Sequence, residues 1–343
     1  KANAADIFRA VVGEHDIQAA VVCKPTFRIE GGRLVPDPGE PWPVGPDPLE
    51  IEGGELDGEL PFYRRGVDVI VVGTAHSPWG EPVPALDVEV TVGSALRRTV
   101  RVFGDRYWVE GRGGPVMTAP EPFMSMPLTW ERAFGGEGEA EAGPVAYGAN
   151  PVGRGFYLSA DEALGSLLPN LEDPEQPVRS WEDHPEPVGT GPYKREWSLR
   201  MRNALLLEDT DEGTRVKALL PTFNNNAHPR MIIEDPRSLK VGDPVRISHV
   251  RADTPDGSLA FSIPPLRLHI HVQLEDRHRM YALYPEQIVV LADEARGMLS
   301  FRVCFQYTVV PMERRFVTLH EGPVPAEVPD AYVVDADALE PTP

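Results

Sequence analysis

The sequence places two histidines at a spacing that could bind a metal ion. His269 and His271 lie in the alternating stretch LRLHIHVQL, so both side chains would project from one face of a β-strand, and a third ligand nearby would complete a zinc or copper site. The same alternation puts them on the polar face beside Arg267 and Gln273, where histidines are ordinarily solvated or paired across strands. We therefore predict neither a metal site nor a cofactor.

Two carboxylates can hydrolyse a glycosidic bond, and four acidic residues lie in or near unusual loops. They are Asp105, Glu121, Glu131 and Glu172. Because the chain has 53 acidic residues, chance supplies many such sets, and Glu131 beside Arg132 or Asp105 beside Arg106 is more simply an ion-paired brace within a loop. No nucleophile elbow, phosphate-binding loop or HExxH motif occurs in the sequence. We predict no catalytic residues, and a carbohydrate-active or other hydrolytic enzyme stays the alternative.

Composition limits the partners and the compartment. The 53 acidic and 33 basic side chains give the 343 residues a formal charge of −20, which repels nucleic-acid backbones and anionic membranes and attracts basic partners. Cys23 and Cys304 have no metal-ligand spacing and make no disulfide framework. No stretch approaches the roughly 18 apolar residues of a membrane span, and the opening residues lack a hydrophobic signal core. We expect a cytoplasmic protein that binds neither nucleic acid nor membrane.

Short apolar runs predict the elements that would position these groups. The 37 prolines and 31 glycines exclude long helices nearly everywhere. The expected strands span 68–75, 86–92, 98–103, 244–250, 258–263, 266–274 and 301–309. Alternation in most of them indicates a mostly β protein with antiparallel sheets, each with one solvated face, arranged like a sandwich or an open barrel.

Between these β-rich parts, residues 117–226 form a loop-rich middle segment with at most short helices. The stretch SADEALGSLL would be one such helix, with Ser159 as its N-cap and Glu162 at the capping-box position. FNNNAHP predicts a turn whose asparagine amides satisfy local backbone groups. We expect one β-rich domain over residues 1–320, including an acidic, Gly- and Pro-rich excursion at 29–59, and a loosely attached acidic tail at 321–343.

Three turn-rich segments within the middle lack the periodicity of a helix or a strand: PLTWERAFGG (127–136), NPVGRGF (150–156) and LPNLEDP (168–174). Together with DVIVVGTAHSPWGEPV and VFGDRYW, in this order and spacing, they resemble the bacterial domain-of-unknown-function 2169 family, which is found beside type VI secretion spike genes. The resemblance runs from about residue 68 to 173 and continues more loosely to about 318. It departs from the family pattern between about 191 and 221.

The resemblance implies a function. Members of that family are regarded as cytoplasmic adaptors or chaperones that bind a toxic effector, often a nuclease, and help load it onto the spike-tip assembly; the family is not known as an enzyme class. We therefore expect a non-enzymatic adaptor with two protein partners, an effector toxin such as a basic nuclease and a spike-tip protein. A structural component of the secretion apparatus is a second alternative.

The resemblance also gives the three segments a role as one interlocked loop platform for protein recognition. Its glycines would allow backbone conformations closed to other residues, its aromatic side chains would anchor the loops, and its charged side chains would pair to fix them. The expected platform residues are Trp130, Glu131, Arg132, Phe134, Gly135, Gly136, Asn150, Pro151, Gly153, Arg154, Gly155, Phe156, Asn170 and Glu172.

Overall fold

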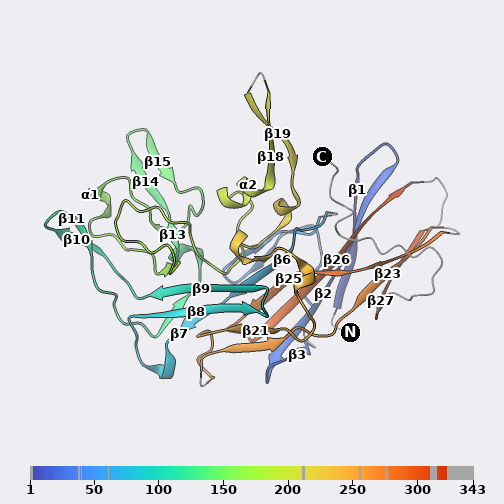
Figure 1. Cartoon of the computed structure of the whole chain (residues 1–343), viewed down its shortest axis with the longest axis horizontal. Coiled ribbons are helices and arrows are strands. Elements are labelled where there is room, and N and C mark those ends of the chain that lie inside the picture. Colours follow the sequence, from blue (N-terminus) through green and yellow to red (C-terminus); the bar gives the residue numbers. More distant parts are fainter. Residues whose placement is uncertain are drawn as a thin grey trace.

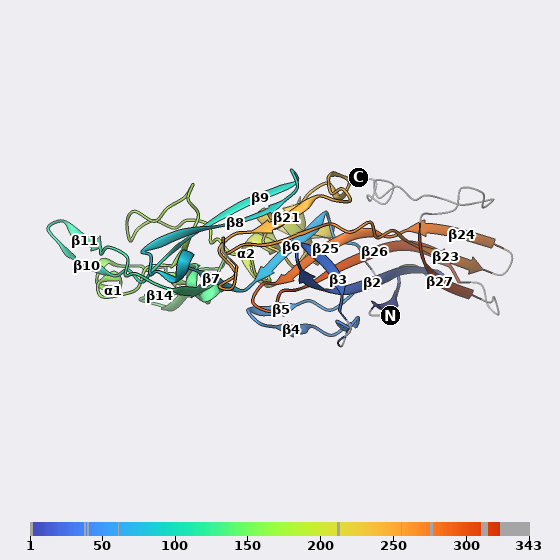
Figure 2. The same ribbon diagram turned by 90° about the horizontal axis from the view of Figure 1, so that it is seen from below.

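The computed structural model describes residues 3–37, 39, 41–60, 62–210, 213–254, 256–274, 277–309 and 315–322. Strands dominate this part of the chain and most of them pair antiparallel, so the predicted mostly β fold is confirmed. The molecule is long and thin when it is seen from below (Figure 2). The predicted acidic tail lies outside the described residues from residue 323 onward.

A seven-stranded sheet forms the centre of the fold (Figure 1). Its order is β1-β2-β26-β25-β6-β20, with β3 paired to the end of β2, and its one parallel pair among the described strands is β25 with β6. The strands are β1 (Asn3–Val11), β2 (Asp16–Glu30), β3 (Arg33–Pro36), β6 (Val67–Val72), β20 (Ile232–Ile233), β25 (Tyr284–Leu291) and β26 (Arg296–Thr308). Residues from both ends of the described chain therefore meet in one sheet.

Two smaller antiparallel sheets lie on either side of it in Figure 1. The five-stranded sheet has the order β17-β9-β8-β21-β22 and the three-stranded sheet the order β24-β23-β27. Their strands are β8 (Ala85–Val92), β9 (Leu96–Phe103), β17 (Leu171–Glu172), β21 (Pro244–Ile247), β22 (Leu259–Ser262), β23 (Leu268–Leu274), β24 (Arg277–Ala282) and β27 (Arg315–Glu321). The hairpin predicted from the alternation at 86–92 and 98–103 is the β8–β9 pair.

Six strand pairs and seven short helical elements complete the described part of the chain. The pairs are β4 (Leu49–Ile51) with β5 (Gly54–Leu56), β7 (Thr74–His76) with β12 (Ser125–Pro127), β10 (Trp108–Gly111) with β11 (Gly114–Met117), β13 (Phe134–Gly135) with β16 (Arg154–Gly155), β14 (Glu137–Ala140) with β15 (Gly143–Ala146), and β18 (Leu205–Thr210) with β19 (Gly213–Leu219). The helical elements are α1 (Ala160–Ala163), α2 (Ser198–Ala204), η1 (Pro78–Gly80), η2 (Trp130–Arg132), η3 (Pro221–Asn224), η4 (Pro229–Met231) and η5 (Pro236–Ser238).

One predicted strand is divided in two, and the predicted helix is shorter than expected. The run at 68–75 is two strands, because the chain leaves the central sheet after β6 and pairs with β12 as β7. The helix predicted at 159–168 is the single turn α1. The Ser159 hydroxyl accepts its cap bond from the Glu162 amide at 3.2 Å, as predicted, but the Glu162 carboxylate accepts from the amide of Leu158. Among the described residues, no helix is long and apolar enough to cross a membrane.

The inner strands of the central sheet are buried on both faces, although the alternation predicted one solvated face. Every residue of β6 is buried, as are residues 19–27 of β2 and 297–305 of β26. One face packs on the apolar core. The other carries charged side chains, such as Arg302, that are buried against the loop containing Glu59 and Arg64. This loop removes the face from water.

Candidate functional site

The three turn-rich segments lie against one another. Strand β13 of the first segment pairs in parallel with β16 of the second. The third segment joins them through a bridge between Ala133 and Leu171, and the amide of Asn170 donates to the carbonyl oxygen of Arg132 at 2.8 Å. Residues 127–136, 150–156 and 168–174 thus form one contiguous unit, which we call the platform.

The platform glycines are required for two different reasons. Gly135, Gly136 and Gly155 have φ values of +148°, +103° and +101°, a region that residues with a side chain rarely adopt. Gly153 does not have a positive φ, but a Cβ at this position would lie 2.6 Å from a backbone carbonyl oxygen of the first segment. Gly135 combines both constraints, because its Cβ would lie 2.0 Å from a backbone oxygen of the second segment. Any side chain at this position would push the two segments apart.

Two buried asparagines tie the loops together. Asn150 donates its side-chain amide to the carbonyl oxygens of Trp130 at 2.8 Å and Phe134 at 3.0 Å. Asn170 donates to the carboxylate of Asp105 at 2.9 Å and to a backbone carbonyl of β9 at 3.1 Å. Since neither side chain is exposed to solvent, these bonds replace the water that the loop oxygens would otherwise bind.

The buried ion pair of the platform joins residues far apart in sequence. The Arg106 guanidinium lies 2.5 Å from one carboxylate oxygen of Glu172, and the other oxygen accepts the amide of Val178 at 3.1 Å. Burial raises the pKa of Glu172, while Arg106 opposes that rise. The expected brace between Asp105 and Arg106 is therefore not observed, because Arg106 is bound to Glu172 instead.

The two arginines of the platform bind uncharged oxygens. Arg132 donates to the side-chain oxygen of Asn170 at 3.2 Å, and Arg154 donates to the backbone carbonyl of Glu131 at 2.9 Å. Glu131 is exposed and its carboxylate makes no ion pair within the described part of the chain. The expected pairing of these three charges is not observed, because the acidic side chain is on the solvent side. Pro151 is half-buried beside them in the sequence.

Aromatic side chains anchor the platform in two clusters. Trp130 packs edge-on against Tyr193 and Trp197 with ring centroids 5.1 and 5.6 Å away, and its indole N–H donates to a backbone carbonyl at 2.7 Å. A second cluster consists of Phe134, Tyr147 and Phe156. The ring centroid of Tyr147 lies 5.1 Å from that of Phe134 and 5.3 Å from that of Phe156. The aromatic side chains of the platform therefore point into the protein, where they anchor its loops.

The four carboxylates considered for hydrolysis have different surroundings. Glu172 is bound to Arg106 and Asp105 accepts from Asn170, so both serve as acceptors inside the platform. Glu121 and Glu131 are exposed. The pair of facing carboxylates that a glycosidase uses has no support in these contacts.

A buried network of charges covers the second face of the central sheet, and none of its residues was predicted as a site. Glu59 is at its centre. The Lys24 ammonium lies 2.6 Å from one of its oxygens, and the guanidinium groups of Arg64 and Arg302 bind the other. Both arginines also bind Glu286, at 2.7 and 2.6 Å. All five side chains are buried, and each has at least one oppositely charged partner inside the protein.

These partners control the protonation of Glu59. Burial alone would raise its pKa, but the positive charges of Arg64, Arg302 and Lys24 hold the pKa well below its ordinary value. The sequence does carry a signal of the network, which is a charged residue inside an otherwise apolar strand: Lys24 in VVCKPTF and Arg302 in LSFRVCF.

The asparagines of FNNNAHP bind both a neighbour and a distant segment, since the side-chain amide of Asn226 donates to the backbone carbonyl of Asn224 at 3.2 Å. The predicted turn is present as η3. The side chain of Asn225 and the backbone amide of Asn226 donate to the two carboxylate oxygens of Asp68 at 2.8 and 2.7 Å. Asn224 donates to the carbonyl of Tyr63 at 3.1 Å. The turn therefore fastens the middle segment to the start of β6, which local sequence cannot reveal.

The histidines of β23 contact other histidines. His271 lies 2.8 Å from His278, nitrogen to nitrogen, and His269 stacks on His320 across the β23–β27 pair. Burial and the neighbouring His278 lower the pKa of His271. This is the cross-strand arrangement weighed against a metal site. Among the described residues, no group of three or more His, Cys, Asp or Glu side chains is placed to hold a metal ion.

Both cysteines are free thiols in adjacent strands, β2 and β26. Burial raises the pKa of Cys23 to about 11 and that of Cys304 to about 12. Both thiols are therefore protonated at neutral pH, which makes them poor nucleophiles and poor metal ligands.

The family of the protein follows from a match over most of its length. A family model described as an uncharacterized protein conserved in bacteria, DUF2169, matches residues 14–302. The chain belongs to the DUF2169 family. No curated protein and no solved structure matches it.

One hairpin of this DUF2169 protein projects from the body of the fold. Strands β18 and β19 pair antiparallel and extend beyond the neighbouring elements at the top of Figure 1. The hairpin, formed by residues 205–210 and 213–219, falls within the stretch at about 191–221 where the sequence is expected to depart from the family pattern.

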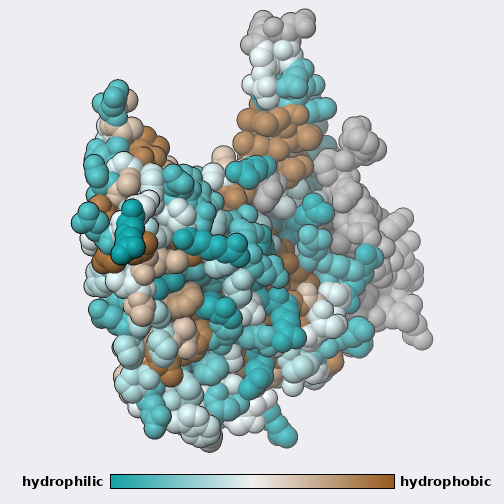
Figure 3. Space-filling view, turned by 60° about the vertical axis from the view of Figure 1, so that its left-hand side comes forward, coloured by the Kyte–Doolittle hydropathy of each residue, from teal (hydrophilic) through white to brown (hydrophobic). Residues whose placement is uncertain are grey.

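One face of the hairpin is apolar and exposed. Leu205 is opposite Leu219 and Leu207 is opposite Val216, with a register shift between the two pairs. Cross-strand neighbours project to the same side, and Leu205 and Leu207 are two residues apart in β18, so the four side chains share one face. Leu207, Val216 and Leu219 have exposed fractions of 55, 53 and 57%. Figure 3 shows hydrophobic residues gathered on the projecting hairpin. We call these four residues of the DUF2169 chain the hairpin face.

Proposed function

We propose that this protein is a non-enzymatic adaptor of a type VI secretion system, which binds an effector toxin in the cytoplasm and helps to load it onto the spike-tip complex. The link to secretion rests on the family resemblance of the motifs. The binding role rests on one structural observation, the hairpin face. Burial of each exposed aliphatic side chain against a partner would contribute about 1–2 kcal/mol of apolar transfer free energy.

The hairpin is suited to a protein partner in two ways. Its apolar face matches an apolar patch, and the Glu208–Arg215 ion pair, at 2.9 Å near the tip, supplies a polar rim. The outer edges of β18 and β19 pair with no third strand among the described residues, so a partner strand can add backbone hydrogen bonds there.

The charge of the chain favours a basic effector such as a nuclease. A protein with a formal charge of −20 attracts the lysines and arginines that a nuclease needs to bind phosphate. Raising the salt from about 50 to 500 mM shortens the screening length from roughly 14 to 4 Å, so the association rate should fall about tenfold while the dissociation rate changes less. An association rate that stays constant over this range contradicts the electrostatic part of the proposal.

Affinity purification from the native host tests the function. We would compare the tagged parent with the double variant Leu207→Ser/Val216→Ser and with Val145→Ser, a control on the separate β14–β15 hairpin whose valine is 43% exposed. A secretion toxin or spike-tip protein should co-purify with the parent and the control, and the toxin should be lost from the double variant. Co-purification of neither protein with the parent, or equal toxin recovery with all three chains, contradicts the proposal.

A further inference from the structure

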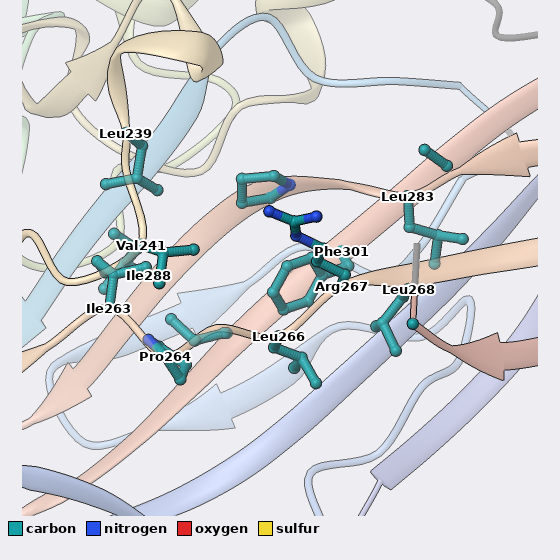
Figure 4. A pocket seen from close by; sticks show the side chains of 14 residues that line it. Leu239, Val241, Ile263, Pro264, Leu266, Arg267, Leu268, Leu283, Ile288 and Phe301 are labelled. Atoms are coloured by element: carbon teal, nitrogen blue, oxygen red, sulfur yellow. The ribbon is translucent and has the colours of Figure 1, made fainter. Parts of the chain in front are cut away.

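An apolar pocket of about 330 Å³ lies over the central sheet. Its floor includes Ile288 of β25 and Leu299 and Phe301 of β26, and its walls come from residues 263–268 and 239–241 (Figure 4). None of these residues belongs to the platform or the hairpin face. The pocket is therefore a separate feature of the molecule.

Two prolines explain why the pocket is open. The alternation predicted a strand from residue 266, but β23 begins at Leu268. Pro264 and Pro265 precede it, and because proline has no amide hydrogen they interrupt backbone pairing. Residues 263–267 instead cross the face of the sheet as an irregular segment, with Leu266 facing the pocket.

The pocket carries a single charged lining residue within the described part of the chain, Arg267. It is exposed, and its guanidinium makes no ion pair or hydrogen bond with any described side chain. Figure 4 draws the guanidinium beside the ring of Phe301, among apolar side chains. This differs from Arg64, Arg106 and Arg302, whose guanidinium groups are all bound to carboxylates.

We propose that this pocket binds an amphipathic carboxylate of the fatty-acid class, with its carboxylate on Arg267 and its chain over Leu266 and Phe301. A guanidinium forms paired, charge-assisted hydrogen bonds with a carboxylate, and one arginine balances one negative charge. A phosphate dianion would need further donors, and every other lining residue is apolar. The volume lies at the lower end of the range for small-molecule sites, about 300–1,000 Å³. The site is independent of the proposed adaptor role.

Titration calorimetry of the full chain with three probes tests the ligand class. Decanoate supplies both the chain and the charge, decanol only the chain, and butyrate the charge with a short chain. Decanoate should bind at one site per chain, and decanol and butyrate should each bind at least about tenfold more weakly, because each lacks one of the two contacts. Equal affinity for decanoate and decanol, or no saturable binding of decanoate, overturns the proposal.

Three variants test the place of binding. Arg267→Gln removes the charge, and Val241→Trp fills the pocket from a lining position that is 55% exposed. Arg9→Gln, an exposed arginine of β1, is the matched control. Decanoate affinity should fall about tenfold or more in the first two and stay unchanged in the control. Unchanged affinity in either pocket variant, with the parental melting temperature retained, assigns the binding elsewhere and overturns the proposal.

Discussion

The platform and the hairpin face differ in where their side chains point. The platform has the more unusual sequence, with tryptophan, adjacent charges and glycine pairs, yet Trp130 and Asn150 are buried and bonded within the protein. The hairpin has ordinary residue types, with three consecutive leucines followed by charged residues, yet Leu207 and Val216 are more than half exposed. Rare residue types mark positions with strict packing demands, whereas a binding surface needs only apolar side chains that no other part of the chain covers.

The largest difference in stability should be between variants of two arginines, one beside the platform and one in the hairpin. Arg106→Leu leaves the buried carboxylate of Glu172 without its partner and should lower the free energy of unfolding by about 3–5 kcal/mol. Arg215→Leu removes an exposed ion pair of the hairpin and should change the free energy of unfolding by less than about 0.5 kcal/mol. Urea unfolding at neutral pH measures both values. Equal effects would mean that the platform is no more tightly structured than the hairpin.

Substitutions at two glycines should distinguish the cost in stability of a steric clash from the cost of an unfavourable backbone conformation. Gly135→Ala places a Cβ 2.0 Å from a backbone oxygen and should cost about 2–4 kcal/mol through strain and displacement of the loops. Gly143→Ala, in the β14–β15 turn, also has positive φ, +114°, but meets open space and should cost about 1 kcal/mol. A thermal or urea melt that ranks Gly143→Ala as the more damaging change contradicts the packing account.

Much of the fold was predictable because its signals are local. Alternation in LDVEVTV and RTVRVF identified the β8–β9 hairpin, and the alternation at 301–309 identified the end of β26. The burial of the second face was not predictable in the same way. It depends on Glu59 and Arg64, which lie in a loop far from β26 in sequence and reach it only in the folded chain.

Acid should weaken the protein through Glu59. Because its folded pKa lies below its ordinary value of 4.5, its contribution is fully present above that pH and is lost as the pH falls toward the folded pKa. The Glu59→Gln variant should have a lower free energy of unfolding than the parent at pH 7. This difference in unfolding free energy should become smaller below about pH 4.5, by at most about 1.4 kcal/mol per pH unit.

Two other buried carboxylates act in the opposite direction to Glu59. Burial raises the folded pKa values of Asp68 and Glu172, so their contributions are greatest below their ordinary pKa and decrease as the pH rises through the folded value. Both groups are present in the parent and in Glu59→Gln, so to a first approximation they cancel in the difference. Urea unfolding at pH 7, 5, 4 and 3 gives that difference directly, and a constant value contradicts the assignment to Glu59.

The candidate site was predictable only in part. The order of the motifs located the platform segments, and the structure brings them together. The ion-pair partners of the charged residues were not predictable. Because Asp105 and Arg106 are adjacent in sequence, we expected them to pair, but Arg106 binds Glu172, which is 66 residues away. The hairpin face had no signal as a surface, since leucines in a strand indicate a core until the fold shows that nothing covers them.

The side chains of the hairpin face should also contribute little to stability. Leu207→Ser/Val216→Ser removes side chains that are already exposed, so the free energy of unfolding should change by less than about 1 kcal/mol in total. Thermal melts of the double variant and of the Val145→Ser control measure this change in stability. A loss of several kcal/mol would mean that the hairpin packs on the body and does not present a free surface.

Hydrogen exchange of the chain alone and with its co-purified partner tests the central contrast most directly. Backbone amides at 205–219 should exchange more slowly in the complex, because the partner covers the hairpin face or adds a strand to its edge. Platform amides that are bonded within the fold, such as those of Asn170 and Phe156, should exchange at the same rate in both samples. Protection confined to residues 127–173, with the hairpin unchanged, would contradict the account and make the platform the recognition surface.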